Sequence, residues 1–218
     1  MKGLILKDLY TLKPLLKAVA FFFVFFGIIG FLGKDAAYLN SSSSIICVLL
    51  CSWGVNCFSY DEYYHWDRFS VTLPCSRACI VLARYLIFLL LALAGLVFSL
   101  AFSFGITLVL SLPFSWGEFI ASALGSLFMG LFLVSVMGPF AYRVSADKLR
   151  YVIFVVVLVP TLLLLLLYQL LRGPALNAIA DWANRNLALV GVGVAAFSVL
   201  LFLGSLALSI RIFSQKEY

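Results

Sequence analysis

The chain has 218 residues, of which 65% are hydrophobic and only 11% are charged, and its mean hydropathy is +1.15. An average soluble domain carries about 25% charged residues, so this composition excludes a water-soluble fold. The net charge of +6 does not indicate a nucleic-acid partner, because the basic residues lie between apolar segments, where the topology of a membrane protein places them.

About six apolar segments, each near the roughly 20 residues that a spanning helix needs, follow one another along the chain. They predict an all-α, polytopic membrane protein in which residues 1–218 form a single transmembrane domain. The second span is the weakest, because four serines at 41–44 dilute its start. The predicted spans cover about 15–33, 41–60, 79–111, 117–141, 150–171 and 187–211.

Residues 1–14 precede the first span and are predicted to form an interfacial amphipathic helix. One face of this helix is apolar and consists of Leu4, Ile5, Leu9 and Leu12. Such a face is typical of helices that lie in the membrane surface. Pro14 lacks an amide donor and disfavours helical geometry at the residue before it, so we expect the chain to turn there into the membrane. A simple basic anchor is the alternative.

Residues 60–78, which we call the aromatic loop, join the second and third predicted spans and combine rings with charges. The charges are expected to keep the loop in water, while the rings supply apolar contact area, a mixture enriched at protein interfaces. We therefore predict a partner-binding surface made of Tyr60, Asp61, Glu62, Tyr63, Tyr64, Trp66, Asp67, Arg68 and Phe69. The alternative is an aromatic belt at the membrane surface, where Tyr and Trp are enriched.

Small residues recur in two of the later spans. Ser122, Ser126 and Gly130 are four residues apart and form a strip suited to close helix packing. Gly191 and Ala195 offer a similar strip in the last span. Between the fifth and sixth spans, residues 172–186 are predicted to form a short outer segment that is amphipathic or re-entrant.

The Lys and Arg residues favour one orientation of the chain in the membrane. With the N-terminus inside, only Lys34, Arg172 and Arg185 lie outside. Because cytoplasmic loops are enriched in Lys and Arg, we predict a multi-pass protein of the plasma membrane whose N- and C-termini are both cytoplasmic. The basic residues then on the cytoplasmic side are Lys2, Lys7, Lys13, Lys17, Arg68, Arg77, Arg84, Arg143, Lys148, Arg150, Arg211 and Lys216.

The predicted spans place no charged residue at mid-membrane, where ion-coupled carriers and proton pumps keep ionisable groups. No catalytic residue and no metal site are predicted, because a lone His65 is more often a surface residue than a catalyst. The five cysteines lack a zinc spacing and are expected to be small buried hydrophobes. Gly33 and Lys34 lack the upstream glycine of a phosphate-binding loop, so no cofactor is expected on this chain. Transport would therefore take its energy from a partner; otherwise the chain is a membrane scaffold or immunity subunit.

Several short motifs stand out along the chain. They are Met-Lys-Gly-Leu-Ile-Leu-Lys-Asp-Leu-Tyr at 1–10, Tyr60-Asp61-Glu62, Trp66, Leu73-Pro74, Ser76-Arg77 and Ile-Val-Leu-Ala-Arg-Tyr at 80–85. These motifs resemble those of ABC-2 type transporter permeases. The resemblance extends over the whole chain in layout, and its specific part lies between residues 60 and 85. Within that family the chain is similar in particular to small bacterial permeases that export peptides, such as the phenol-soluble modulin exporters and related bacteriocin-immunity systems.

The resemblance implies a bacterial exporter built from two permease copies, identical or related, each docked on a separate cytoplasmic ATPase that binds ATP and Mg²⁺. Residues 1–14 would be the connecting helix, and residues 61–69 would lie at or next to the coupling helix that contacts the ATPase. Residues 172–186 would match a re-entrant region before the last span. The cargo implied is an amphipathic or antimicrobial-type peptide.

Overall fold

The computed structural model describes residues 2–14, 17–18, 20–22, 24–25, 27–28, 36–70, 75–110, 116–170 and 186–215. Their regular secondary structure is helical throughout, as the sequence predicts. The helices are α1 (Lys2–Leu12), α3 (Ala36–Tyr63), α4 (Trp66–Ser70), α5 (Arg77–Leu110), α6 (Trp116–Arg143), α7 (Ala146–Leu170) and α9 (Leu187–Ser214).

Four described helices are long and apolar enough to cross a membrane. They contain the candidate spans Ser44–Tyr63, Arg77–Val109, Phe119–Arg143 and Leu189–Ser214. α7 contains a shorter apolar stretch at Phe154–Leu163. The predicted first span at 15–33 is described only in fragments, and the predicted outer segment at 172–186 lies almost entirely outside the described residues. The count of six spans therefore stays a prediction.

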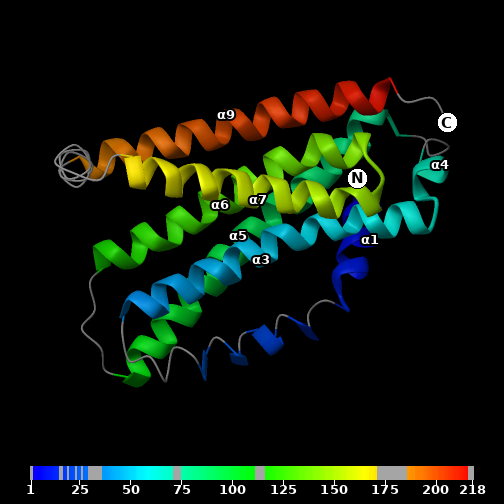
Figure 1. Cartoon of the computed structure of the whole chain (residues 1–218). Coiled ribbons are helices and arrows are strands. Elements are labelled where there is room, and N and C mark those ends of the chain that lie inside the picture. Colours follow the sequence, from blue (N-terminus) through cyan, green and yellow to red (C-terminus); the bar gives the residue numbers. More distant parts are fainter. Residues whose placement is uncertain are drawn as a thin grey trace.

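The long helices run past one another as a bundle, with α1 and α4 toward the same end of it as the C-terminal end of α9 (Figure 1). α3 contacts both α5 and α6 along much of its length, and α6 also contacts α9. The core between these four helices is largely aromatic and aliphatic. Its buried residues are Cys51, Val81, Tyr85, Phe88, Ala92, Leu131, Val134, Tyr142 and Phe213.

The N-terminal segment is helical, but the face that it turns toward the bundle differs from the predicted apolar face. Leu12 is buried and Ile5 is half-buried, whereas Leu9 is exposed. Asp8, which lies on the same side as Ile5 and Leu12, is buried instead. The bundle therefore receives a carboxylate from α1, and the location of this helix at the membrane surface stays a prediction.

Small residues bring α6 close to α3. A Cβ atom added at Gly130 would lie 2.4 Å from the Sγ atom of Cys51, and Ser126, one turn earlier, is buried. The predicted small-residue strip on this helix is thus confirmed. The predicted burial of the cysteines is confirmed for Cys47, Cys51 and Cys57 but is wrong for Cys75 and Cys79, which are half-buried; all five are free thiols.

Of the second predicted strip, on α9, Ala195 is half-buried, and the prediction of close packing is wrong for Gly191 among the described residues. Gly191 is exposed, and a Cβ atom there would meet nothing within 4 Å. The residues that α9 buries in the bundle are Phe213 and three serines, Ser198, Ser205 and Ser209. A serine hydroxyl fits such a contact because it can hydrogen-bond to a neighbouring helix or to its own backbone.

Gly138 on α6 lies where the hydroxyl of Tyr85 meets α9. A Cβ atom at Gly138 would lie 2.3 Å from the Oη atom of Tyr85. That hydroxyl is held by hydrogen bonds to the Oγ atoms of Ser205, at 2.6 Å, and Ser209, at 2.7 Å. The ring therefore has little freedom to move aside, and only glycine fits here.

We expect Gly138→Ala to lower the free energy of unfolding by about 1–3 kcal/mol, the usual cost of overpacking a core. Thermal unfolding of the detergent-purified protein measures this. Gly125→Ala on the same helix is the matched control, because its Cβ atom would meet nothing within 4 Å. The control should be neutral or stabilising by up to about 1 kcal/mol, since alanine favours a helix over glycine. Equal effects of the two substitutions would contradict the close contact.

Candidate functional site

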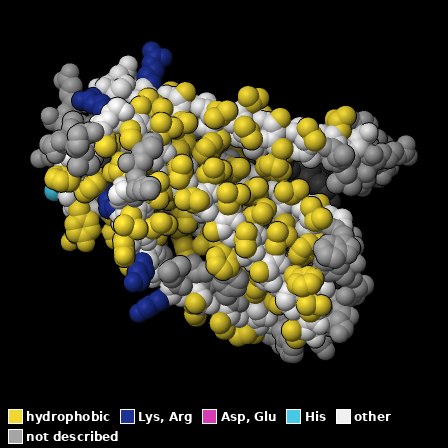
Figure 2. Space-filling view, turned by 180° about the vertical axis from the view of Figure 1, so that it is seen from behind, with side chains coloured by type: hydrophobic (Ala, Val, Ile, Leu, Met, Phe, Trp, Pro, Cys, Tyr) yellow, Lys and Arg dark blue, Asp and Glu magenta, His cyan; other side chains and the backbone are white. Residues whose placement is uncertain are grey.

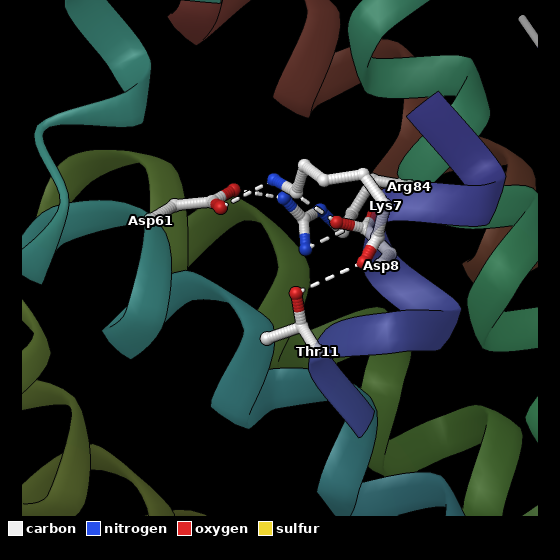
Figure 3. A network of polar contacts seen from close by, with 5 residues as sticks. All are labelled: Lys7, Asp8, Thr11, Asp61 and Arg84. Atoms are coloured by element: carbon white, nitrogen blue, oxygen red, sulfur yellow. Dashed lines mark hydrogen bonds and ion pairs between the residues drawn. The ribbon is translucent and has the colours of Figure 1, made fainter. Parts of the chain in front are cut away.

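Four charged side chains from three helices meet next to the aromatic loop (Figure 3). Lys7 and Asp8 come from α1, Asp61 from the end of α3, and Arg84 from the second turn of α5. We call these four residues the charge network. Asp8, Asp61 and Arg84 are only 4%, 6% and 6% exposed. The two positive and two negative charges balance, which is the condition under which buried ions are tolerated.

Asp61 is the best-held acid of the charge network. Its Oδ1 atom accepts a hydrogen bond from the Nζ atom of Lys7 at 2.5 Å, and its Oδ2 atom accepts one from the Nη2 atom of Arg84. Both carboxylate oxygens are therefore used, one on each cation. Asp61 links all three helices through charge-assisted hydrogen bonds, which are the strong ones.

Asp8 is held mainly by charge. Its carboxylate oxygens lie 3.1 Å from the Nζ atom of Lys7 and 3.2 Å from the Nη1 atom of Arg84. Among the described residues, neither the Oδ1 atom of Asp8 nor the Nη1 atom of Arg84 has a hydrogen-bond partner. The contacts of Asp8 are thus weaker than those of Asp61, although the two acids are equally buried.

Burial raises the pKa of the Asp8 carboxyl above its usual range, and the nearby Arg84 and Lys7 oppose that rise only in part. An acid whose pKa is raised in the fold is destabilising once it is ionised. This cost is absent below the carboxyl pKa of the unfolded chain and appears as the pH rises through the raised value. Asp8 is therefore an acid of the charge network whose ionisation costs stability.

Two aromatic rings extend the charge network into the surrounding structure. The guanidinium carbon of Arg84 lies 4.9 Å from the centre of the Phe58 ring, and the Nζ atom of Lys7 lies 4.3 Å from that of the Trp66 ring. Both are cation–π distances. Phe58 in turn packs edge-on against Tyr142 of α6, with ring centres 5.0 Å apart. Lys7 thus connects α1 directly to α4.

The aromatic loop is largely helical in its described part. α3 continues through Tyr60 to Tyr63, a turn follows, and α4 begins at Trp66. His65 in this turn has a φ of 51°, a left-handed conformation that is uncommon for a residue other than glycine. The reversal between α3 and α4 is therefore a tight corner.

The structure separates the predicted partner-binding residues into two groups. Tyr63 and Tyr64 are 77% and 71% exposed, and Glu62 and Phe69 are exposed as well. Tyr60 and Trp66 are half-buried. Asp67 and Arg68 lie in α4, but their side chains are outside the described part.

Asp61 corrects the sequence interpretation. It was expected to keep the loop in water, but it is buried in ion pairs within the chain. The burial of Arg84 was not expected either, because the sequence places it on the cytoplasmic side. Arg84 lies near the start of the candidate span Arg77–Val109 and is buried, so the expectation that no charge lies at mid-membrane stays a prediction. One signal was available, because Arg84 stands inside the predicted span at 79–111, where a charge is rarely kept without a function. Lys7 and Asp8 gave no comparable signal.

Among the described residues, no group of three or more His, Cys, Asp or Glu side chains could hold a metal ion. The site therefore offers ion pairs and ring contacts. Such an arrangement can join helices and respond when one of them moves.

The model of the family described as "ABC-2 family transporter protein" matches residues 3–214. This range contains all four residues of the charge network as well as the aromatic loop. No protein with a curated description matches the chain.

Proposed function

Since the chain belongs to the ABC-2 family of transporter proteins, we propose that it is the permease subunit of an ATP-driven ABC exporter. ABC-2 permeases normally work with an ATPase subunit, which here would be a separate cytoplasmic protein that binds ATP and Mg²⁺. The proposed assembly contains a second permease copy, identical or related, in the plasma membrane of a bacterium. The proposed cargo is an amphipathic or antimicrobial-type peptide, which suits spans whose lining residues are mainly apolar.

The exposed tyrosines at the end of α3 carry the docking part of this proposal. Tyr63 and Tyr64 stack edge-on, with ring centres 5.0 Å apart, and both are largely exposed. Large rings with a polar tip are enriched at the centres of protein interfaces. We call these two residues the tyrosine pair, and we assign the ATPase contact to it together with the neighbouring Phe69.

The charge network supplies a route from that contact into the bundle. Asp61 lies two residues before the tyrosine pair on the same helix, so a shift of this helix end moves its carboxylate. Because that carboxylate is hydrogen-bonded to Lys7 and Arg84, the shift is passed to α1 and α5. A mechanical link of this kind needs contacts that differ between two states, and buried ion pairs change sharply in energy when they separate.

We expect the double substitution Tyr63→Ala and Tyr64→Ala to weaken binding of the ATPase subunit. Loss of a single hot-spot aromatic costs about 2 kcal/mol, or about thirtyfold in affinity. The permease is purified from membranes that also contain the ATP-binding protein, and the amount of that protein retained is measured with the nucleotide hydrolysis of the complex.

Tyr151→Ala is the matched control, because Tyr151 is 73% exposed but belongs to α7 and not to the aromatic loop. The control should retain the ATPase subunit. Undiminished retention by the double variant would remove the tyrosine pair from the interface. If the intact permease retains no ATP-binding protein at all, the chain is instead a non-transporting scaffold or immunity subunit.

A further inference from the structure

A groove of about 550 Å³ runs between α6 and α9 on the outside of the bundle. Its volume falls within the range of about 300–1,000 Å³ that is usual for ligand sites. The groove is apolar over most of its length and reaches Arg143 at the last turn of α6. Its apolar lining includes Pro139, Phe140, Phe197, Leu201, Gly204 and Leu208.

The two hydroxyl side chains in the groove wall are already used inside the protein. The Oγ atom of Ser135 donates a hydrogen bond to the carbonyl oxygen of Leu131 at 2.7 Å, and that of Ser205 is bonded to the Tyr85 hydroxyl. The wall therefore presents hydrocarbon contact to an occupant. Gly204 leaves the groove open, because a Cβ atom there would meet nothing within 4 Å.

The length of the groove fits an extended acyl chain. Its lining on α9 extends from Phe197 to Ile212, about 22 Å at 1.5 Å per residue. One membrane leaflet is only about 15 Å of hydrocarbon, so the acyl chain of a lipid can lie along the groove within that length.

The charge of the groove lies at one end only. Arg143 is exposed and lines the groove beside Ile212. Figure 2 shows Lys and Arg side chains gathered toward one end of the molecule, with apolar side chains covering much of the rest of that face. An arginine at such an end matches the phosphate of a lipid headgroup in geometry and in charge.

We propose that the α6–α9 groove binds an anionic phospholipid, with one acyl chain along the groove and the phosphate at Arg143. The groove makes apolar contact where a chain needs it and carries a cation where a headgroup needs one. Binding would fix the spacing of α6 and α9, the helices that hold Gly138 and the serines bonded to Tyr85.

The first test uses the full permease in detergent, titrated with phosphatidylglycerol or phosphatidylcholine and observed by native mass spectrometry. The intact protein should bind about one phosphatidylglycerol per chain in preference to phosphatidylcholine. Gly204→Phe adds a ring in the groove, at a position where the Cβ atom itself would meet nothing within 4 Å, and should lower binding of both lipids about tenfold. Gly193→Phe on the same helix is the control, because a Cβ atom there also meets nothing within 4 Å and Gly193 does not line the groove.

A second pair of variants tests the headgroup. Arg143→Gln should reduce the preference for phosphatidylglycerol over phosphatidylcholine about fivefold, the effect of one cation near a membrane surface. Arg211→Gln is its control, since Arg211 is exposed in the last turn of α9 but does not line the groove.

Unchanged lipid binding in Gly204→Phe, or an unchanged preference in Arg143→Gln, would overturn the proposal. Loss of permease dimers in Gly204→Phe with lipid binding intact would assign the groove to a second copy and also overturn it. Neither readout requires the ATPase, so failure here is distinguishable from failure of the proposed export function.

Discussion

Asp61→Asn is expected to lower the free energy of unfolding by about 3–5 kcal/mol, because it removes one partner of a buried ion pair and leaves the other charge behind. Arg84 would retain only Asp8, with which it makes an ion pair but no hydrogen bond. The network would also carry one excess positive charge. Thermal and denaturant unfolding of the detergent-purified chain measures the loss.

Asp8→Asn is the matched control for this prediction. It makes the same chemical change on an equally buried acid of the same network, but burial already disfavours the ionised form of Asp8. We therefore expect Asp8→Asn to lower the free energy of unfolding by no more than about 1 kcal/mol. This difference from the unsubstituted protein should shrink as the pH rises through the raised pKa of Asp8, because only the unsubstituted protein then has to ionise that buried acid. Equal losses for the two variants would contradict the assigned difference between the two acids.

The double variant Asp61→Asn with Arg84→Met tests whether the loss comes from an unpaired charge. It leaves Lys7 beside Asp8, a pair 3.1 Å apart and neutral overall. Most of the stability lost in Asp61→Asn should return, because replacing both partners of a buried pair is far less costly than removing one. A simple sum of the two single effects would contradict the pairing.

Trp66→Ala is expected to lower ATP-driven transport about tenfold while the ATPase subunit stays bound. Coupling free energies between sites are commonly about 1–3 kcal/mol, or about 5–150-fold. Trp66 is half-buried and its ring lies over the Nζ atom of Lys7, so it joins α4 to the charge network. Peptide uptake into inside-out vesicles is measured together with ATP hydrolysis in the same sample.

Two further substitutions sharpen this test. Trp66→Phe keeps a ring over Lys7 and should retain most of the transport. Phe69→Ala removes an exposed ring that packs on Trp66 at 5.2 Å, so it should affect ATPase binding more than coupling. Normal transport per ATP hydrolysed in Trp66→Ala would exclude α4 from the coupling route.

The helices of the bundle were predictable because their signal is local. Long apolar runs at 79–111, 117–141 and 187–211 lie within or almost within α5, α6 and α9, and each of these helices contains a candidate span. The serine-rich stretch at 41–44 weakened the prediction for the second span, yet α3 runs through it without a break. Serine is tolerated there because its hydroxyl can bond to the backbone of the preceding turn.

The charge network was not predictable in the same way, because it depends on pairs that are distant in sequence. Arg84 and Asp61 are 23 residues apart, and Lys7 and Asp61 are 54 residues apart. Five aromatic residues lie near position 61 in the sequence. On composition alone, a carboxylate among them fits an exposed surface as well as it fits a buried ion pair. Only the packing of α1 and α5 against the end of α3 decides that it is buried.

The prediction of close packing was wrong at Gly191 for a related reason. Small-residue spacing identifies a face that permits close approach, but it does not say which partner is present. Serines at 198, 205 and 209 provide the same small size together with a hydrogen bond, and they face the bundle instead. Gly191 remains on the outer surface of α9.

The length of α3 has a consequence for how the two membrane faces communicate. It is a single helix of 28 residues, about 42 Å from end to end, and it carries Tyr63 and Asp61 at one extremity. About two thirds of the way along it, Gly54 lies so close to α5 that a Cβ atom would come within 2.6 Å of the Phe88 ring. α3 also lies close to α6 at Cys51 and to α5 at Cys47, so it is held along its length and not at one pivot. We therefore expect a displacement at Tyr63 to be carried along this single helix toward Ala36, with α5 and α6 moving together with it.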